Sequence, residues 1–322
     1  MIPDLPRISL ATLPTPLLAA PRLSEAVGVE VWIKRDDLTG LLLGGNKARK
    51  LEFLCGEAAA RGADTLVTGG GAGSNHVQLT AAAAARLGLG CVAVCYGTPP
   101  AAGEPPGLRL TRRLGADVAF TGSPERASVD ARLDEVAAKL AADGRVPYVI
   151  PRGGASAVGA VGYALAAVEL ASQLDGAGVA GATVLLATGS CGSQAGLVAG
   201  AVLGAAGFAV VGVPVSRPPA EVVERVAGLA TACAARIGSD AAFGPSDVNL
   251  LGGYLGPGYG KASLQGDEAA ALAARTEGLV LDPVFTAKAM AALVAEARAG
   301  RLAGPVVFLH TGGTPAALAA LP

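Results

Sequence analysis

The chain has few of the residues that build disulfide frameworks or metal centres. Its 322 residues include five cysteines and two histidines. The cysteines form no C-x-x-C pair, and an odd number of them cannot all pair within one chain. We therefore expect neither a disulfide framework nor a metal site.

The chain also lacks an excess of charge of either sign. Its 25 basic and 26 acidic residues give a net charge of −1, without the positive excess that binds nucleic acid or anionic membranes. Although 52% of the residues are hydrophobic, glycine, proline or a charge interrupts each apolar run before about 18 residues accumulate. The N-terminus carries no basic segment followed by an apolar one. We expect a soluble, cytoplasmic protein with neither a nucleic-acid nor a membrane partner.

Short β-branched segments alternate with alanine-rich helical segments along nearly the whole chain. Thr65–Thr68 and Thr183–Thr188, for example, are predicted strands, and Asn75–Leu87 is a predicted helix. The strands are almost continuously apolar, which is typical of parallel strands covered on both faces. This pattern predicts an α/β protein of two domains, with open, mainly parallel twisted sheets flanked by helices. A Pro/Gly break at 151–154 lies between the two series of strands and helices.

Two glycine-rich segments together specify a chemistry. Gly44-Gly45-Asn46-Lys47 places an amine at a tight turn that opens a helix, and Gly189–Gly196 joins a predicted strand to a helix. The second arrangement binds phosphate through backbone N–H groups. An amine together with a phosphate loop is what pyridoxal phosphate (PLP) requires, because a lysine holds one end of it covalently. Each segment alone could also be a solvated basic cluster or a structural turn.

A third glycine-rich loop precedes Ser74-Asn75-His76, again between a predicted strand and a helix. Its glycines do not follow G-x-G-x-x-G, and the next strand ends without the acidic residue that would hold a ribose. A dinucleotide site is therefore disfavoured. His76 is expected to face a ligand, as is the segment His310–Thr311 at the end of the last predicted strand, because ligands in such sheets bind at the carboxyl ends of strands.

These segments resemble the D-cysteine desulfhydrase / 1-aminocyclopropane-1-carboxylate (ACC) deaminase family, which are PLP enzymes of the tryptophan-synthase-β fold type. The resemblance runs from Leu13 to Gly313 and rests on three blocks: Gly44–Leu54, Pro257–Gly260 and His310–Gly313. It implies PLP in an interdomain cleft, a small amino-acid substrate and a homodimer. We expect a large PLP-binding domain over 1–50 and 155–322 and a small α/β domain over 51–154.

The resemblance also implies roles for individual residues. Lys47 would carry the cofactor and remove the α-proton, with Ser74 and Tyr259 as further catalytic residues. Asn75 would bond the phenolic oxygen of the cofactor, and Thr311 would face its pyridine nitrogen. The implied cofactor-binding set is Asn46, Lys47, Asn75, Gly189, Ser190, Cys191, Gly192, Ser193 and Thr311. The implied substrate-binding set is Ser74, Asn75, His76, Tyr259 and Phe285.

Two positions separate reactions within this family. ACC deaminases look to have Tyr-Glu where this chain has Phe285-Thr286, and that glutamate keeps the pyridine nitrogen protonated. We expect the pyridine here to meet only the hydroxyls of Thr311 and Thr286, which favours β-elimination over opening of a cyclopropane. Ser74-Asn75-His76 likewise resembles the desulfhydrases, since deaminases carry Ser-Asn-Gln. The expected reaction converts D-cysteine to pyruvate, hydrogen sulfide and ammonia.

Other functions stay open. Phe285 replaces the tyrosine of the desulfhydrases, and Arg152 stands where they have an uncharged residue. A cation there could serve the sulfonate of L-cysteate, or it could simply be a surface arginine. L-cysteate sulfo-lyase and ACC deaminase are therefore alternatives. A nicotinamide-dependent dehydrogenase and a non-catalytic small-molecule-binding relative are alternatives of other classes, although a dehydrogenase does not account for the lysine turn or the Thr311 segment.

Overall fold

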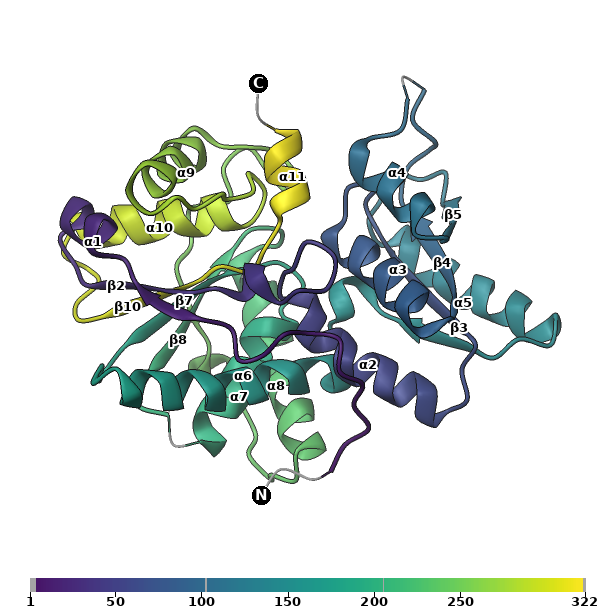
Figure 1. Ribbon diagram of the computed structural model, residues 1–322, viewed down its shortest axis with the longest axis horizontal. Coiled ribbons are helices and arrows are strands. Elements are labelled where there is room, and N and C mark those ends of the chain that lie inside the picture. Colours follow the sequence, from purple (N-terminus) through teal and green to yellow (C-terminus); the bar gives the residue numbers. More distant parts are fainter. Residues whose placement is uncertain (1–3, 102, 205, 321–322) are drawn as a thin grey trace.

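A computed structural model describes residues 4–101, 103–204 and 206–320. Within these residues the strands form two separate sheets, which lie on opposite sides of the molecule in Figure 1. One sheet contains, in spatial order, β1 (Leu17–Ala19), β2 (Val31–Lys34), β10 (Val306–Leu309), β7 (Thr183–Thr188), β8 (Ala209–Pro214) and β9 (Asn249–Leu250). The other contains β5 (Asp117–Phe120), β4 (Gly90–Cys95), β3 (Thr65–Gly70) and β6 (Pro147–Ile150).

The six-stranded sheet is parallel except at β1, which pairs antiparallel with β2. Val307 packs toward one face, against α6 (Ala157–Gly176), α7 (Gly192–Leu203) and α8 (Pro219–Arg236). Val306 and Phe308 pack toward the other face, against α1 (Pro21–Val27), α9 (Leu264–Glu277) and α10 (Thr286–Arg298). Because both faces are covered, successive side chains of the central strand β10 are all apolar. The predicted α/β class with mainly parallel sheets is confirmed.

The four-stranded sheet is parallel throughout and is built entirely from residues 65–150. On one side Leu66 and Ile150 belong to a core shared with α2 (Lys47–Ala60) and α3 (Asn75–Leu87). On the other side Val67 and Val94 pack against α5 (Ser128–Ala142). Since α2 contacts both α3 and α6, the domain boundaries placed at 50/51 and 154/155 stay a prediction.

Helix α6 lies at the centre of the molecule, where glycines allow close contact with its neighbours. A Cβ at Gly162 would collide with the backbone carbonyl of Arg49 in α2. A Cβ at Gly196 or Gly200 of α7 would collide with carbonyl oxygens of α6. Among the described residues α6 is the one helix long and apolar enough to cross a membrane, but 56% of its 18-residue apolar window is buried within the protein. Its composition is accounted for by this packing against α2 and α7.

Candidate active site

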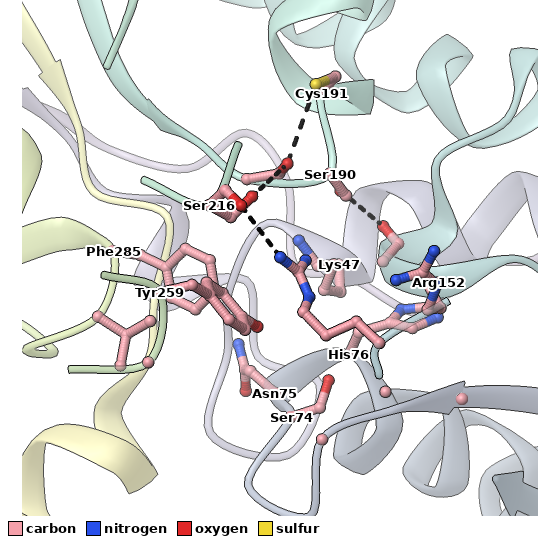
Figure 2. A pocket seen from close by; sticks show the side chains of 18 of the residues that line it. Lys47, Ser74, Asn75, His76, Arg152, Ser190, Cys191, Ser216, Tyr259 and Phe285 are labelled. Atoms are coloured by element: carbon pink, nitrogen blue, oxygen red, sulfur yellow. Dashed lines mark hydrogen bonds between the residues drawn. The ribbon is translucent and has the colours of Figure 1, made fainter. Parts of the chain in front are cut away.

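A cavity of about 680 Å³ lies between the two sheets. Its wall is made by the segments that follow β3, β7 and β10, so it lies at the carboxyl ends of parallel strands, as expected for an open α/β protein. Figure 2 shows side chains from these distant segments gathered around it. Of the expected site residues, the following line the cavity: Asn46, Lys47, Ser74, Asn75, His76, Gly189, Ser190, Cys191, Ser193, Tyr259, Phe285 and Thr311. Gly192 and Thr286 do not belong to the wall.

Lys47 is the first residue of α2 and lies half-buried in the cavity wall. The turn before it requires glycine, because Gly45 has φ 124° and a Cβ there would lie 2.9 Å from Nδ2 of Asn75 and 3.2 Å from the carbonyl of Thr311. Burial lowers the pKa of Lys47 to about 8, although the negative charge of Asp282 partly opposes this. At pH 7 about a tenth of the amine is therefore neutral, far more than for an ordinary lysine, and a nucleophile and a proton acceptor both require the neutral form.

The loop after β7 has the form of a phosphate site. The cavity wall includes Gly189, Ser190 and Cys191, and α7 begins directly after them at Gly192. Cys191 has φ 75°, a left-handed conformation that is uncommon for a residue with a side chain. A twelve-residue helix that begins at this loop presents the positive end of its dipole to an anion.

Lys50 lies behind this loop and was not expected as a site residue. Its Nζ lies 3.0 Å from where a Cβ of Gly192 would be and 3.3 Å from the carbonyl of Gly153, to which it donates. Burial, with the nearby cation of Lys47, lowers the pKa of Lys50 well below its usual value. The spacing of Lys50 from Lys47, one helical turn along α2, was the available signal.

The helix α3 brings Ser74, Asn75 and His76 into the cavity wall. The hydroxyl of Ser74 caps the helix by accepting from the N–H of Val77 at 3.4 Å. Within the described residues, Oδ1 of Asn75 and Nδ1 of His76 are buried without a hydrogen-bond partner. Burial and the cations of Lys47 and Lys50 lower the pKa of His76 well below its usual value, so the ring is neutral. Buried polar atoms that remain unpaired beside a cavity are suited to a polar ligand.

Tyr259 and Phe285 lie together on the opposite wall (Figure 2). Their ring centroids are 6.2 Å apart at an interplanar angle of 73°. The guanidinium of Arg126 lies over one ring of the pair, 3.9 Å from the centroid of Tyr259. A Cβ at Gly189 would lie 2.9 Å from the ring of Phe285, so this pair also packs against the phosphate-type loop.

The expectation that the pyridine would meet only hydroxyls stays a prediction, but a buried carboxylate that was not expected at the site, Asp282, lines the same cavity as Thr311. Its Oδ1 accepts from the backbone N–H groups of Val284 and Phe285 at 3.0 and 2.7 Å. Its Oδ2 accepts from the N–H and the hydroxyl of Thr286 at 3.0 and 2.8 Å. Burial raises the pKa of Asp282, and these hydrogen bonds oppose the rise. From the sequence, Asp282 could not be distinguished from a carboxylate that only caps α10.

Arg152 also lines the cavity, but its charge is already paired. Its Nε and NH2 donate to the two carboxylate oxygens of Asp130 at 2.7 and 2.6 Å. This bidentate pair leaves less of the cation available for an anionic substrate group.

The residues present fit PLP. Lys47 would supply the amine, and the Gly189–Ser193 segment with the start of α7 would supply the phosphate site. The unpaired oxygen of Asn75 lies in the same cavity. Asn46 contacts both the phosphate-type loop and the segment after β10. Its side chain donates to the hydroxyl of Ser193 at 3.0 Å, and its N–H donates to the carbonyl of Thr311 at 2.9 Å. One cavity therefore holds both groups that the cofactor needs.

Comparisons with known proteins agree with this fit. A family model described as pyridoxal-phosphate dependent enzyme matches residues 8–312. The chain is 44% identical to a protein named D-cysteine desulfhydrase from Klebsiella pneumoniae (strain 342), over 98% of this chain and 96% of that protein. A protein of the same name from Salmonella paratyphi A is also 44% identical over the same shares. A solved structure described as an ACC deaminase homologue superposes with a TM-score of 0.90 at 35% identity, over 97% of this chain and 93% of that one.

The processed form of threonine deaminase isoform 2 from Solanum lycopersicum superposes with a TM-score of 0.66 at 20% identity, over 94% of this chain and 80% of that one, which shows likeness of fold alone. The match to the family model spans nearly the whole chain and includes the lysine turn, the phosphate-type loop and the Thr311 segment. The resemblance inferred from the sequence is confirmed. The chain belongs to the family of pyridoxal-phosphate-dependent enzymes.

Proposed function

We propose that this enzyme catalyses PLP-dependent β-elimination on D-cysteine, giving pyruvate, hydrogen sulfide and ammonia. The observation that carries the proposal is the cavity in which the Lys47 amine faces a phosphate-type loop. The two D-cysteine desulfhydrases, similar along nearly the full length of both chains, support the choice of reaction and substrate.

The roles of the protein side chains follow from their places in the cavity. When bound, PLP supplies the electron sink for the α-carbon. The start of α3, with Ser74, Asn75 and His76, binds the substrate carboxylate and so fixes which face of the α-carbon is turned toward Lys47. Lys47 accepts the α-proton, and the electron pair of the C–S bond leaves with sulfur as HS⁻. Water is consumed in releasing pyruvate and ammonia, which balances the reaction.

The other reactions of the family are less compatible with the cavity. For L-cysteate, the Arg152 guanidinium would have to leave its bidentate contact with Asp130. For ACC, a carboxylate would have to support a protonated pyridine, yet Asp282 already accepts four hydrogen bonds, about as many as a carboxylate can take. Elimination of a good leaving group makes the smaller demand on the electron sink.

The test is product release by purified, PLP-loaded protein from D-cysteine, β-chloro-D-alanine, D-serine, L-cysteate and ACC. We expect pyruvate from D-cysteine, with an equal amount of sulfide, and from β-chloro-D-alanine. Turnover of L-cysteate faster than that of D-cysteine would refute the proposal in favour of the sulfo-lyase reaction. Release of 2-oxobutyrate from ACC as fast as pyruvate from any other substrate would refute it in favour of the deaminase reaction. A protein that binds PLP but transforms none of these compounds would support the non-catalytic alternative.

We also propose that the enzyme is a cytoplasmic homodimer. The family resemblance supports the dimer, and five free, buried cysteines suit a reducing compartment. Sedimentation equilibrium should give twice the mass of the chain, and cell fractionation should recover the activity with the cytosol.

A further inference from the structure

Arg126 lines the cavity and makes a contact across it. It lies in the segment between β5 and α5, beside the four-stranded sheet. Its NH1 donates at 3.0 Å to the carbonyl of Ser216, which follows β8 of the six-stranded sheet. Its guanidinium carbon lies 3.9 Å from the ring centroid of Tyr259, also on that side. One side chain thus joins the two walls, and Figure 2 shows Ser216 and Tyr259 on the wall that it reaches.

Arg126 differs from two other arginines of the cavity wall in its partners. Arg152 is paired with Asp130, and Arg217 is paired with Glu221. No carboxylate within the described chain forms an ion pair with Arg126. Its partners are a backbone carbonyl and an aromatic face, and a cation held over a ring in a partly buried site is attracted by the ring quadrupole.

The partners of Arg126 connect directly to the catalytic machinery. Tyr259 is held between the guanidinium of Arg126 on its face and the edge contact with Phe285. The hydroxyl of Ser216 donates at 2.9 Å to the carbonyl of Gly189, in the phosphate-type loop. A shift of Arg126 would therefore be transmitted both to the Tyr259 ring and to the segment that borders the cofactor site.

We propose that Arg126 is a positioning residue that joins the two walls of the cavity and fixes the ring of Tyr259 over the substrate. The proposal deepens the proposed function and rests on it only for the catalytic role of Tyr259. The contact itself joins the segment before α5 to the segment after β8, whichever amino acid is bound.

The charge of Arg126 also acts on the phenol of Tyr259. Burial raises the pKa of Tyr259; Arg126 and Arg152 lower it, and Tyr96 and Asp282 raise it. Removing the charge of Arg126 therefore raises the pKa of Tyr259 further. A step that depends on this ionisation should move to higher pH in Arg126→Gln and stay in place in Arg126→Lys.

The experiment compares PLP-loaded wild type, Arg126→Gln, Arg126→Lys and Tyr259→Phe, with Arg132→Gln as the matched control. Arg132 lies on the same side of the molecule, in α5, and is an exposed arginine that pairs with Glu135. We expect kcat on D-cysteine to fall about tenfold in Arg126→Gln with a smaller change in KM, because the reacting groups are misplaced. The alkaline limb of the kcat–pH profile should move to higher pH in Arg126→Gln and should be absent in Tyr259→Phe. Arg132→Gln should match wild type throughout.

Hydrogen exchange of the same holoenzymes, without substrate, gives a second measurement. Arg126→Gln should exchange faster than wild type over 121–128, 214–217 and 254–260, and Arg132→Gln should not. Equal exchange in Arg126→Gln and Arg132→Gln, or an unmoved alkaline limb with unchanged kcat, would overturn the proposal. Wild type that fails on D-cysteine would overturn the proposed function instead, and the exchange comparison would still decide the role of Arg126.

Discussion

Lys47 and Lys50 lie one turn apart on α2, but their amines have different surroundings. Lys47 lines the cavity, whereas Lys50 lies against Gly153 and Gly192 behind the phosphate-type loop. Burial lowers the pKa of both amines. Position rather than basicity is therefore our reason to expect the cofactor on Lys47 and its phosphate beside Lys50.

Lys47→Ala should abolish the covalent attachment of the cofactor and all elimination, because we expect this residue to be both the covalent anchor and the proton acceptor. Lys50→Ala should keep the covalent attachment, with weaker binding of PLP. Intact-mass measurement after borohydride reduction and denaturation shows whether the cofactor stays on the chain, and absorbance titration with PLP measures its affinity. A cofactor that stays attached in Lys47→Ala and is lost in Lys50→Ala would move the covalent attachment to Lys50.

Phe285 and Thr286 differ in what a substitution would do. Phe285→Tyr should leave ACC inert, because it adds a hydroxyl without freeing Asp282. Thr286→Glu should lower the free energy of unfolding by about 3–5 kcal/mol, because it would bury a second carboxylate against Asp282 and remove a hydrogen bond. Urea titration measures the loss, and 2-oxobutyrate assays measure the reaction. Rapid ACC turnover by Phe285→Tyr would contradict the first expectation. Wild-type stability of Thr286→Glu would contradict the second.

Helix α7 can approach α6 only because its contact residues are glycines. Gly196→Ala should lower the free energy of unfolding by about 1–3 kcal/mol, since the new methyl group would collide with the carbonyl of Ala160. Gly228 in α8 is the control: it is exposed, and a Cβ there has nothing within 4 Å. Gly228→Ala should instead stabilise by about 0.5–1 kcal/mol. Urea titrations of the two variants should therefore shift in opposite directions.

Long periodic elements were predictable from the sequence, and short ones were not. The helix Asn75–Leu87 and the strand Thr183–Thr188 have the predicted bounds. The strands β1 and β9 contain three and two residues, too few to show a period of two. α7 begins at Gly192, inside the glycine-rich segment predicted to join a strand to a helix, because the glycine loop is continuous with the helix.

The predicted site came from motifs that each lie in one segment, and most of its residues line one cavity. Asp282, Arg126 and Lys50 were missed for a common reason. Their importance depends on partners brought close by folding: Thr286 and the cavity for Asp282, Tyr259 for Arg126, and Gly192 for Lys50. No local pattern of residue types separates Asp282 or Arg126 from capping or solvated side chains, whereas the helical spacing of Lys50 from Lys47 was a signal.

A buried ionic network joins distant parts of the chain. The guanidinium of Arg49 donates to both carboxylate oxygens of Asp36 at 2.8 and 2.9 Å, and to both of Glu169 in α6 at 2.8 and 2.9 Å. Burial alone would raise the pKa of Asp36, but the charge and hydrogen bonds of Arg49 outweigh it and lower the pKa. Burial alone would likewise raise the pKa of Glu169, but the hydrogen bonds and charges of Arg49 and Lys34 outweigh it and lower the pKa.

Both carboxylates therefore have folded-state pKa values below their unfolded ones, so their contribution to stability is present above the unfolded pKa and is lost as the pH falls through the folded value. We expect the free energy of unfolding to fall steeply below pH of about 4. Asp36→Asn should cost about 3–5 kcal/mol at neutral pH, because Arg49 loses a buried counter-charge, and it should flatten the acid limb. Urea titrations across this range, with the exposed Asp134→Asn as control, measure both effects.

The amine of Lys50 beside the phosphate-type loop should couple cofactor binding to the uptake of a proton. Burial and the cation of Lys47 hold the pKa of Lys50 well below its usual value. A phosphate dianion at Gly192 would favour the ammonium form, so affinity for PLP should fall as the pH rises. Calorimetry in two buffers of different protonation enthalpy should detect the proton in Lys47→Ala, which binds PLP without the covalent bond. Equal proton uptake by the double variant Lys47→Ala with Lys50→Met would contradict the assignment of the proton to the Lys50 amine.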